Sequence, residues 1–322
     1  MTRRAGLLIL AFVLIAALAP LLAPYDPGRT FREFLHAPPM TPKFAGFGLP
    51  TARPLVLADR LEQRFEADPA RTVPLPWFGS DDRSPVFLLG SDSLGRDELS
   101  RLLYGARTSI GLALVATLGA LCIGAFAGSL AGLRGGWMDE TVMRLADFVL
   151  VLPMIYVVLV LRAVLPLVLA PSTVFVLVAL IFVLVGWPFV AKGVRAIVAA
   201  ERDRDYILAA RSLGAGPLRL LTRHLIPACA GYLVVQATIL LPAFVLAEAT
   251  LSFVGLGFPD AVPSWGTMLI EAANVGSLAR FPWTLSPALA IFLVAMSANA
   301  LTSQRDLRRR VVCRVGSRPL EF

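Results

Sequence analysis

The chain has 322 residues, of which 57% are hydrophobic and only 16% are charged, and its mean hydropathy is +0.73. Soluble chains carry about 25% charged residues, so this composition excludes a conventional soluble globule and predicts an integral membrane protein. The net charge of +8 does not indicate a nucleic-acid partner, because the arginines lie at the ends of the hydrophobic runs.

Six hydrophobic runs are long enough to cross a bilayer, which takes about 20 mostly apolar residues. The first follows Arg3 and Arg4, and we expect an uncleaved anchor rather than a signal peptide because Pro24 stands just after the small residues at its end. The predicted fold class is therefore all-α, with six transmembrane helices. The runs are Ala5–Ala23, Thr108–Leu133, Phe148–Ala170, Thr173–Ala191, Ala228–Val254 and Trp283–Leu301.

The orientation follows from the bias of arginine and lysine toward cytoplasmic loops. With the N-terminus inside, the cytoplasmic side receives Arg134, Arg144, the stretch Lys192–Arg223 and the stretch Arg305–Arg318. The short outer loops then hold only Arg280. Both termini are expected in the cytoplasm.

The segment after the first run is rich in proline and aromatic residues, and we interpret residues 25–88 as a partly ordered periplasmic insertion. Its one expected helix is Leu55–Ala67. Four leucines further on, at positions 94, 99, 102 and 103, predict an amphipathic helix at the outer membrane surface.

Glycines recur every fourth residue in the second run, at Gly124, Gly128 and Gly132. Such spacing lets two helices approach closely. We expect packing within one subunit, and an interface between two subunits is the alternative, which the spacing does not distinguish.

Two ionisable residues, Arg162 and Glu248, lie within or near the hydrophobic runs. A charge at the bilayer centre costs about 2.5–3.5 kcal/mol, so such residues usually face a cavity or a partner. Both are candidates for lining a translocation pathway. Arg162 extending to the outer surface, and a structural role for Glu248, are the alternatives.

The chain from Asp205 to Pro227 is an arginine-rich stretch between two very hydrophobic runs. It predicts two short helices separated at Gly214, a residue type that commonly ends a helix in the left-handed conformation, with Pro217 in the first turn of the second helix. Each helix has one apolar face at helical spacing. These faces consist of Tyr206, Ala209, Ala210 and Leu213 in the first helix, and Leu218, Leu221, Thr222 and Leu225 in the second. The two alanines allow a partner to approach closely, so we interpret the hairpin as a docking element.

The hairpin resembles the cytoplasmic loop of ABC-type importer permeases, whose pattern is E-A-A, three residues, G, nine residues, I-x-L-P. Leu208–Ala210, Gly214 and the end of the pattern at His224, Ile226 and Pro227 keep every spacing. Leu208, His224 and Ile226 differ in residue type. The resemblance implies that the residues coupling to an ATPase are Asp205, Tyr206, Ala209, Ala210, Arg211, Leu213, Gly214 and Ala215.

The segment that leads into the second run resembles the dipeptide, oligopeptide and nickel branch of the same family. The matching residues are Asp92, Gly95, Arg96, Asp97, Ser100, Arg101, Tyr104, Gly105 and Arg107. The resemblance implies the type I ABC importer permease fold and half of a transmembrane pore that carries peptides, nickel or other small solutes by alternating access. It divides the chain into an anchor (1–24), the insertion (25–88), a permease domain (89–303) with its coupling hairpin (203–227), and a basic cytoplasmic tail (304–322).

By the same resemblance, the partners are two ABC ATPase subunits, a second permease that is homologous or identical, a periplasmic or lipid-anchored solute-binding protein, and the lipids of a bacterial or archaeal inner membrane. No enzyme chemistry, cofactor or metal site is expected. Neither Lys43 nor Lys192 follows a glycine, which excludes a Walker-A phosphate loop, and the three cysteines lack metal-ligand spacing. ATP hydrolysis is therefore expected on another polypeptide.

Two alternatives remain from the sequence. An ion-gradient-driven secondary transporter or channel, with Arg162 and Glu248 as a relay, predicts inverted repeats, which the chain does not visibly contain. A membrane-anchored binding module built from residues 25–84 would not need five further runs.

Overall fold

The computed structural model of the chain describes residues 2–43, 50–59, 63–78, 84–153, 156–160 and 170–316. They form two compact units. The first, here called the helical unit, is made of Met1–Ile9, Leu112–Glu248 and Val294–Phe322, and the second, the insertion unit, of Leu10–Gly111 and Ala249–Leu293. Each unit is described by itself.

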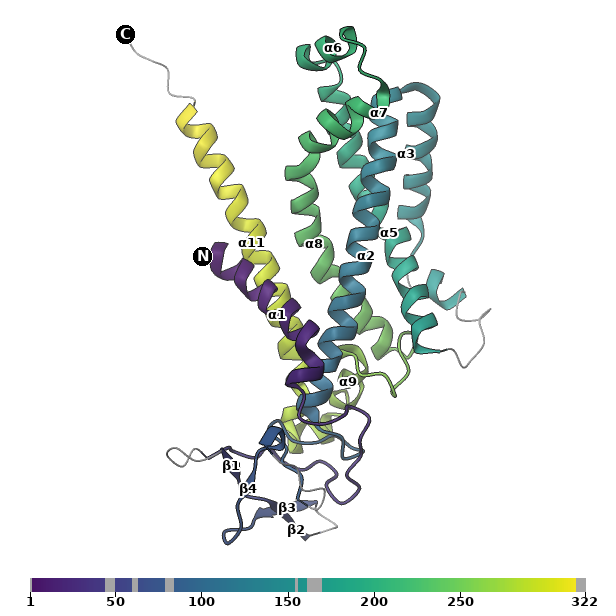
Figure 1. The fold of residues 1–322 in the computed structure, drawn as a ribbon. Coiled ribbons are helices and arrows are strands. Elements are labelled where there is room, and N and C mark those ends of the chain that lie inside the picture. Colours follow the sequence, from purple (N-terminus) through teal and green to yellow (C-terminus); the bar gives the residue numbers. More distant parts are fainter. Residues whose placement is uncertain are drawn as a thin grey trace. The chain divides into compact units, whose positions relative to one another are not determined.

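Four helical stretches of the described residues are long and apolar enough to cross a membrane, and they confirm four of the six predicted runs. They are Glu98–Arg134, Pro171–Glu201, Pro217–Phe253 and Pro282–Leu301. They contain all or part of the long helices α2 (Glu98–Arg134), α5 (Pro171–Glu201), α8 (Ile226–Phe253) and α11 (Ser286–Gly316) (Figure 1). The first run forms α1 (Thr2–Leu22), with a shorter apolar stretch, Leu10–Leu22. The third run begins in α3 (Gly136–Val151), and most of the rest lies outside the described residues.

In the helical unit, the glycines of α2 pack directly against α5. A Cβ atom at Gly128 would lie 2.3 Å from the backbone oxygen of Ala191, and one at Gly124 would lie 2.7 Å from that of Trp187. Real Cβ atoms do not approach backbone this closely, so only glycine fits. Packing within one subunit is thereby confirmed for this glycine series.

Helix α5 also packs against α8, whose larger side chains contact two glycines of α5, Gly186 and Gly193. The ring of Tyr232 lies against Gly193, and the phenolic oxygen donates to the backbone oxygen of Phe189 at 2.9 Å. Phe244 lies against Gly186. Helix α5 is therefore held by close backbone approach on one side and by aromatic packing on another.

The insertion folds on an aromatic core that contains Tyr25, Phe31 and Phe87. The predicted helix Leu55–Ala67 is wrong. This stretch forms two antiparallel strands, β2 (Leu55–Asp59) and β3 (Arg64–Ala67), with Leu57 opposite Phe65. Tertiary packing overrides helix propensity here, because Leu55 and Phe65 pack against the core as strand residues and Gln63 adopts a φ of +52° that a helix does not allow.

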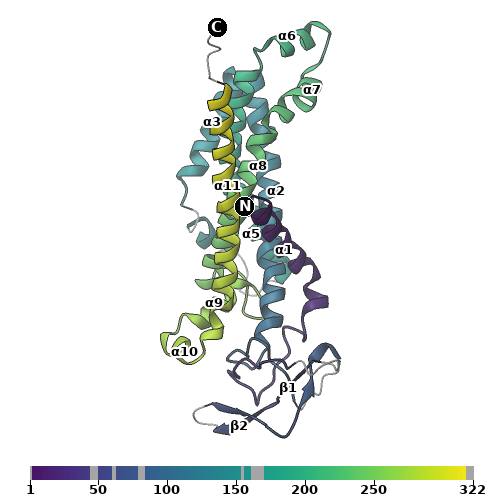
Figure 2. The ribbon, with the colours of Figure 1, turned by 90° about the vertical axis from the view of Figure 1, so that its left-hand side faces the viewer.

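The remaining short elements complete the insertion unit. Strands β1 (Thr51–Ala52) and β4 (Val73–Pro74) pair, and η1 (Pro76–Phe78) follows them. Helices α9 (Trp265–Ala272) and α10 (Val275–Arg280) and the turn η3 (Pro282–Leu285) contact one another (Figure 2). The side chains of Ser264 and Asn274 cap α9 and α10, as these residue types favour.

The predicted amphipathic surface helix is not separate. Leu94 precedes α2, in a turn where Gly95 has a φ of +73°, and the other three leucines lie in the first turns of the continuous 37-residue helix α2.

Candidate functional site

The hairpin consists of α6 (Asp205–Ser212) and α7 (Pro217–Leu220), which join the end of α5 to the start of α8 (Figure 1). Gly214 has a φ of +85°. Its amide donates to the oxygen of Arg211 at 2.9 Å, and the amide of Ala215 donates to the oxygen of Ala210 at 3.0 Å. These two hydrogen bonds are a Schellman motif, so the predicted helix break at Gly214 is confirmed.

Most of the apolar face predicted for α6 is open to solvent. Leu213 is 89% exposed, Tyr206 is 45% exposed and Ala209 is also exposed, while Ala210 is half-buried. Ile207 is fully buried on the opposite face and anchors α6. The sequence analysis did not predict this anchor. The signal that could have identified it is that Ile207 is apolar but lies off the helical face formed by Tyr206, Ala209 and Leu213.

The residues of the second predicted face do not share one environment. Leu221 and Leu225 are buried, but Leu218 is 71% exposed and Thr222 is exposed, while Leu220 is buried. A π-helical turn, η2 (Leu221–Leu225), interrupts the α-helix within this stretch. Its wider turn changes the spacing only from Leu221 onward, so it does not account for the exposure of Leu218 or the burial of Leu220.

Side-chain contacts attach the hairpin to the ends of the neighbouring helices. The hydroxyl of Tyr206 donates to Oε2 of Glu201 at 2.7 Å, which raises the pKa of Tyr206, and its ring lies 6.2 Å from that of His224. Nη1 of Arg202 donates to the backbone oxygen of Gly132 at 3.1 Å. The end of α5 is thus held to the end of α2, directly before the hairpin begins.

Two ion pairs join α3 to α5 in the same unit. Nε of Arg195 donates to Oδ1 of Asp139 at 2.8 Å, and Lys192 pairs with Asp147. The hydrogen bond from Arg195 holds the pKa of Asp139 below its usual range. Helix α5, which leads into the hairpin, is therefore fixed by polar contacts as well as by the glycines of α2.

The two predicted pathway residues have different outcomes. Glu248 is 1% exposed and lies within α8, five residues before its end. Arg162 lies outside the described residues.

A second polar constellation lies in the insertion unit, in the segment before α2 and its first turn. Asp92 is buried and contacts both Arg96 and Arg101, and these arginines also contact Asp260. Nearby, Oε1 of Glu271 accepts from the amide of Ser93 at 2.6 Å, and burial raises the pKa of Glu271. The sequence identified three of these residues as motif positions, but it did not predict that they gather around Asp260.

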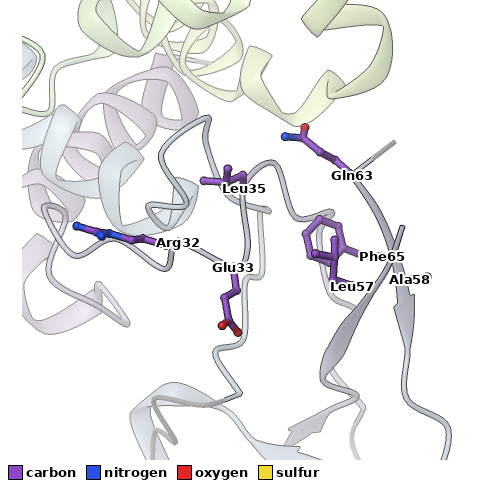
Figure 3. A pocket seen from close by; sticks show the side chains of 7 residues that line it. All are labelled: Arg32, Glu33, Leu35, Leu57, Ala58, Gln63 and Phe65. Carbon is purple, nitrogen blue, oxygen red and sulfur yellow. The ribbon is translucent and has the colours of Figure 1, made fainter. Parts of the chain in front are cut away.

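A cavity of about 520 Å³ lies in the insertion, between the loop that carries Arg32 and Glu33 and the β2–β3 hairpin (Figure 3). Leu57 and Phe65 lie side by side in its wall, and Phe65 stacks on Phe34 at 6.1 Å between ring centroids. The cavity is thus part of the aromatic packing of the insertion.

Comparison with known proteins agrees with the hairpin and the helices. Residues 120–311 match the family described as "Binding-protein-dependent transport system inner membrane component", which is more than half of the chain. The chain is 35% identical over 298 residues to the di/tripeptide transport system permease protein DppC of Pseudomonas aeruginosa (strain UCBPP-PA14), covering 92% of this chain and 83% of that protein. This coverage takes in most of residues 25–88, so the similarity reaches beyond the motifs noted in the sequence.

Two further relatives agree. The dipeptide transport system permease protein DppC of Haemophilus influenzae (strain ATCC 51907 / DSM 11121 / KW20 / Rd) is 30% identical over 92% of this chain and 87% of its own length. The oligopeptide transport system permease protein OppC of Bacillus subtilis (strain 168) is 37% identical over 65% of this chain and 62% of its own length. The chain therefore belongs to the family of binding-protein-dependent transport system inner membrane components and is a multi-pass permease subunit of an ABC importer, with ATP hydrolysis on a separate subunit.

Proposed function

We propose that the exposed face of α6 and the turn after it form the surface on which the ATPase subunits dock. The residues assigned to coupling are Asp205, Tyr206, Ala209, Ala210, Arg211, Leu213, Gly214 and Ala215. The exposure of Leu213, at 89%, is the observation that carries the proposal. An exposed leucine, tyrosine and alanine on one short helix offer apolar area that a partner can remove from water.

The local structure suits the transmission of motion. The Schellman motif at Gly214 and the buried side chain of Ile207 fix α6 as a small rigid body, and the Tyr206–Glu201 hydrogen bond links it to α5. Closure of the ATPases on ATP displaces the docked hairpin, α5 and α8 move with it, and the pore alternates between outward-open and inward-open states.

The pore needs further subunits beyond this chain. We assign to the complete importer two ATPases, a second permease that is homologous or identical, and a solute-binding protein on the outer side. Membrane lipids are the remaining partners and surround the assembled importer. The domain boundaries assigned to the chain are 1–24, 25–88, 89–303 and 304–322.

Peptides are the proposed cargo. Three relatives with 30–37% identity are described as permeases for dipeptides, di- and tripeptides or oligopeptides. Nickel or another small solute is the second candidate. Uptake of radiolabelled dialanine by cells that express the complete importer, compared with cells that lack this chain, tests the cargo. Peptide uptake that does not depend on the chain would contradict the assignment.

The proposed orientation places both termini and the hairpin in the cytoplasm and residues 25–88 outside. Cysteines introduced at Arg211 and Arg309 should resist impermeant thiol reagents in intact cells, whereas a cysteine at Thr41, an exposed position of the insertion, should react. Labelling of position 211 from outside would reject both the topology and the docking surface.

Glu248 is proposed to line the pathway or hold its gate, together with Arg162. Its burial within a membrane helix supports a pathway or gating role, because a carboxylate in that setting usually serves a polar route or a specific contact. Glu248→Gln should impair uptake and leave membrane insertion and ATPase association intact. Loss of the protein from the membrane would instead show a structural role.

A further inference from the structure

Two buried arginines face a cavity in the insertion unit. Arg96 and Arg101 have side chains only 8% and 3% exposed, and both line a cavity of about 300 Å³ together with Asp260 and Glu271. A buried guanidinium requires carboxylate partners, because it stays protonated at any physiological pH. The carboxylates around the pair therefore indicate what the cavity is built to hold.

Asp92 is the permanent counterion of the pair. Its side chain is 2% exposed, and Oδ2 accepts from Nε of Arg96 at 2.6 Å and lies 3.6 Å from Nε of Arg101. Oδ1 accepts from the amides of Leu94 and Arg96 at 2.9 and 2.8 Å. Every strong contact of this carboxylate is local and buried, so we expect it to stay in place.

Asp260 completes the charge balance in a different way. It lies 3.3 Å from Nη1 of Arg96 and 3.7 Å from Nη2 of Arg101, and its side chain is 59% exposed. These contacts are longer than the distance of about 2.7–2.9 Å that is typical of a charge-assisted hydrogen bond. Two guanidiniums and one buried carboxylate leave one positive charge, which an exposed and loosely held carboxylate neutralises.

We propose that the arginine pair is a binding site for the carboxylate of a small peptide, and that Asp260 occupies it as an internal substitute until the peptide displaces it. This inference rests on the proposed peptide cargo. Guanidiniums recognise carboxylates by paired N–H donors, and the two arginines that now hold Asp260 also line the cavity. The cavity volume is at the lower end of the range for ligand pockets, about 300–1,000 Å³, which suits a di- or tripeptide.

Acidic groups in the same cavity refine the ligand. Glu98 and Glu271 line the wall, and Oε1 of Glu271 lies 3.4 Å from Nδ1 of His36. Both side chains are largely buried, with Glu98 3% and Glu271 20% exposed, so their ionised forms are disfavoured while the site is empty. An ammonium group beside them would favour the ionised forms, so the cavity suits a molecule that carries an ammonium group as well as a carboxylate. A free amino terminus and a free carboxyl terminus together meet this requirement.

The test compares dialanine with its C-terminal amide, using the assembled permease–ATPase complex without its solute-binding protein. Equilibrium binding of radiolabelled dialanine is expected, and the amide should compete at least about tenfold less well, which corresponds to about 1.4 kcal/mol. Asp260→Asn removes the internal competitor and should tighten dialanine binding several-fold. Glu66→Gln, at another exposed acid that pairs with an arginine of the same unit, is the matched control and should leave binding unchanged.

Equal competition by dialanine and its amide would overturn the site, and so would unchanged dialanine binding in Asp260→Asn. The site would also be overturned if Asp260→Asn changed only the affinity of the complex for the solute-binding protein. Asp260 would then contact that protein instead of competing with the peptide. The failure of the cargo proposal is distinguishable, because the wild-type importer would then take up no peptide. Normal peptide uptake with an Asp260→Asn variant that binds dialanine like the wild type would reject only the site.

Discussion

The hairpin of α6 and α7 and the arginine pair at the start of α2 both carry charged motif residues, but they are built in opposite ways. In the hairpin, the backbone hydrogen bonds at Gly214 span at most five residues and the apolar side chains are exposed. In the arginine pair, the guanidiniums are buried and reach Asp260 across 164 residues of sequence. We propose that the first is a surface for another protein, whereas the contacts of the second lie within the chain.

This contrast predicts where substitutions act. A change on the hairpin should leave the folded subunit intact and affect assembly, since little of the surface is buried in the subunit itself. A change at the arginine pair should affect the stability of the subunit, because desolvated charges depend on each other.

The largest effect is expected for Asp92→Asn. This change leaves two buried guanidiniums with only the exposed carboxylate of Asp260, so it should lower the free energy of unfolding by about 3–5 kcal/mol. Denaturant unfolding of the purified protein measures it. Asp203→Asn is the control, because Asp203 is 74% exposed beside Arg202 and its loss should cost about 0–1 kcal/mol. Equal effects of the two substitutions would remove the contrast between buried and exposed charge.

The next effect is a pH dependence at Asp97. Burial raises the pKa of this carboxyl from 3.8 to about 6, and Oδ2 accepts from the amide and hydroxyl of Ser100. Between about pH 4 and 6 the folded protein binds more protons than the unfolded chain, so stability should fall as pH rises through this window, by at most about 3 kcal/mol. Asp97→Asn, whose amide oxygen still accepts from Ser100, should flatten the profile of melting temperature against pH. A profile identical to that of the wild type would reject this role.

A smaller effect is expected along α2, where Gly128 in the helical unit and Gly111 in the insertion unit form a matched pair. Gly128→Ala places a methyl group 2.3 Å from the backbone oxygen of Ala191, so α2 and α5 must separate, at a cost of about 1–3 kcal/mol. Gly111→Ala meets no atom within 4 Å and should be neutral or slightly stabilising, as alanine favours helix. Thermal unfolding of both variants tests this, and equal melting temperatures would contradict the packing of α2 on α5.

The smallest effect on stability is expected for Gly214→Ala. A Cβ at this position meets no atom within 4 Å, but the φ of +85° costs an alanine about 1 kcal/mol. The subunit should insert and unfold almost like the wild type. Its association with the ATPase should weaken, because the changed backbone at position 214 alters the orientation of the end of α6. Unweakened association in this variant would show that the helix end does not set the docking angle.

The sequence predicted the hairpin well because its signals are local. Gly214 and Pro217 each act on their own turn, and the apolar spacing of α6 follows a regular helix. The second face was predicted less well, because Leu218 and Thr222 are exposed while Leu221 and Leu225 are buried. No residue type predicts the π-helical turn Leu221–Leu225 in this stretch. The family assignment, from several motifs in order, is confirmed and removes the alternative of an ion-gradient-driven transporter.

Long-range features were not predictable in the same way. The stretch Leu55–Ala67 has residues that favour helix, yet the packing of Leu55 and Phe65 on the aromatic core selects strands. Likewise, nothing in the sequence places Asp260 beside Arg96 and Arg101, because that contact depends on how the loop after α8 returns to the start of α2. Contacts that depend on chain topology need the fold itself.

The central claim is that α6 is the surface on which the ATPases act, and Ala209→Asp tests it most directly. The change places a carboxylate in the proposed apolar contact, where its desolvation is costly. Ala209→Ser is the matched control, because it keeps the side chain small and uncharged. The measurement is co-purification of the ATPase subunits with each variant from membranes, with substrate-stimulated ATP hydrolysis of the same samples. We expect normal membrane insertion of both variants, loss of ATPase association and hydrolysis in Ala209→Asp, and retention of both in Ala209→Ser. Wild-type association and hydrolysis in Ala209→Asp would contradict the account.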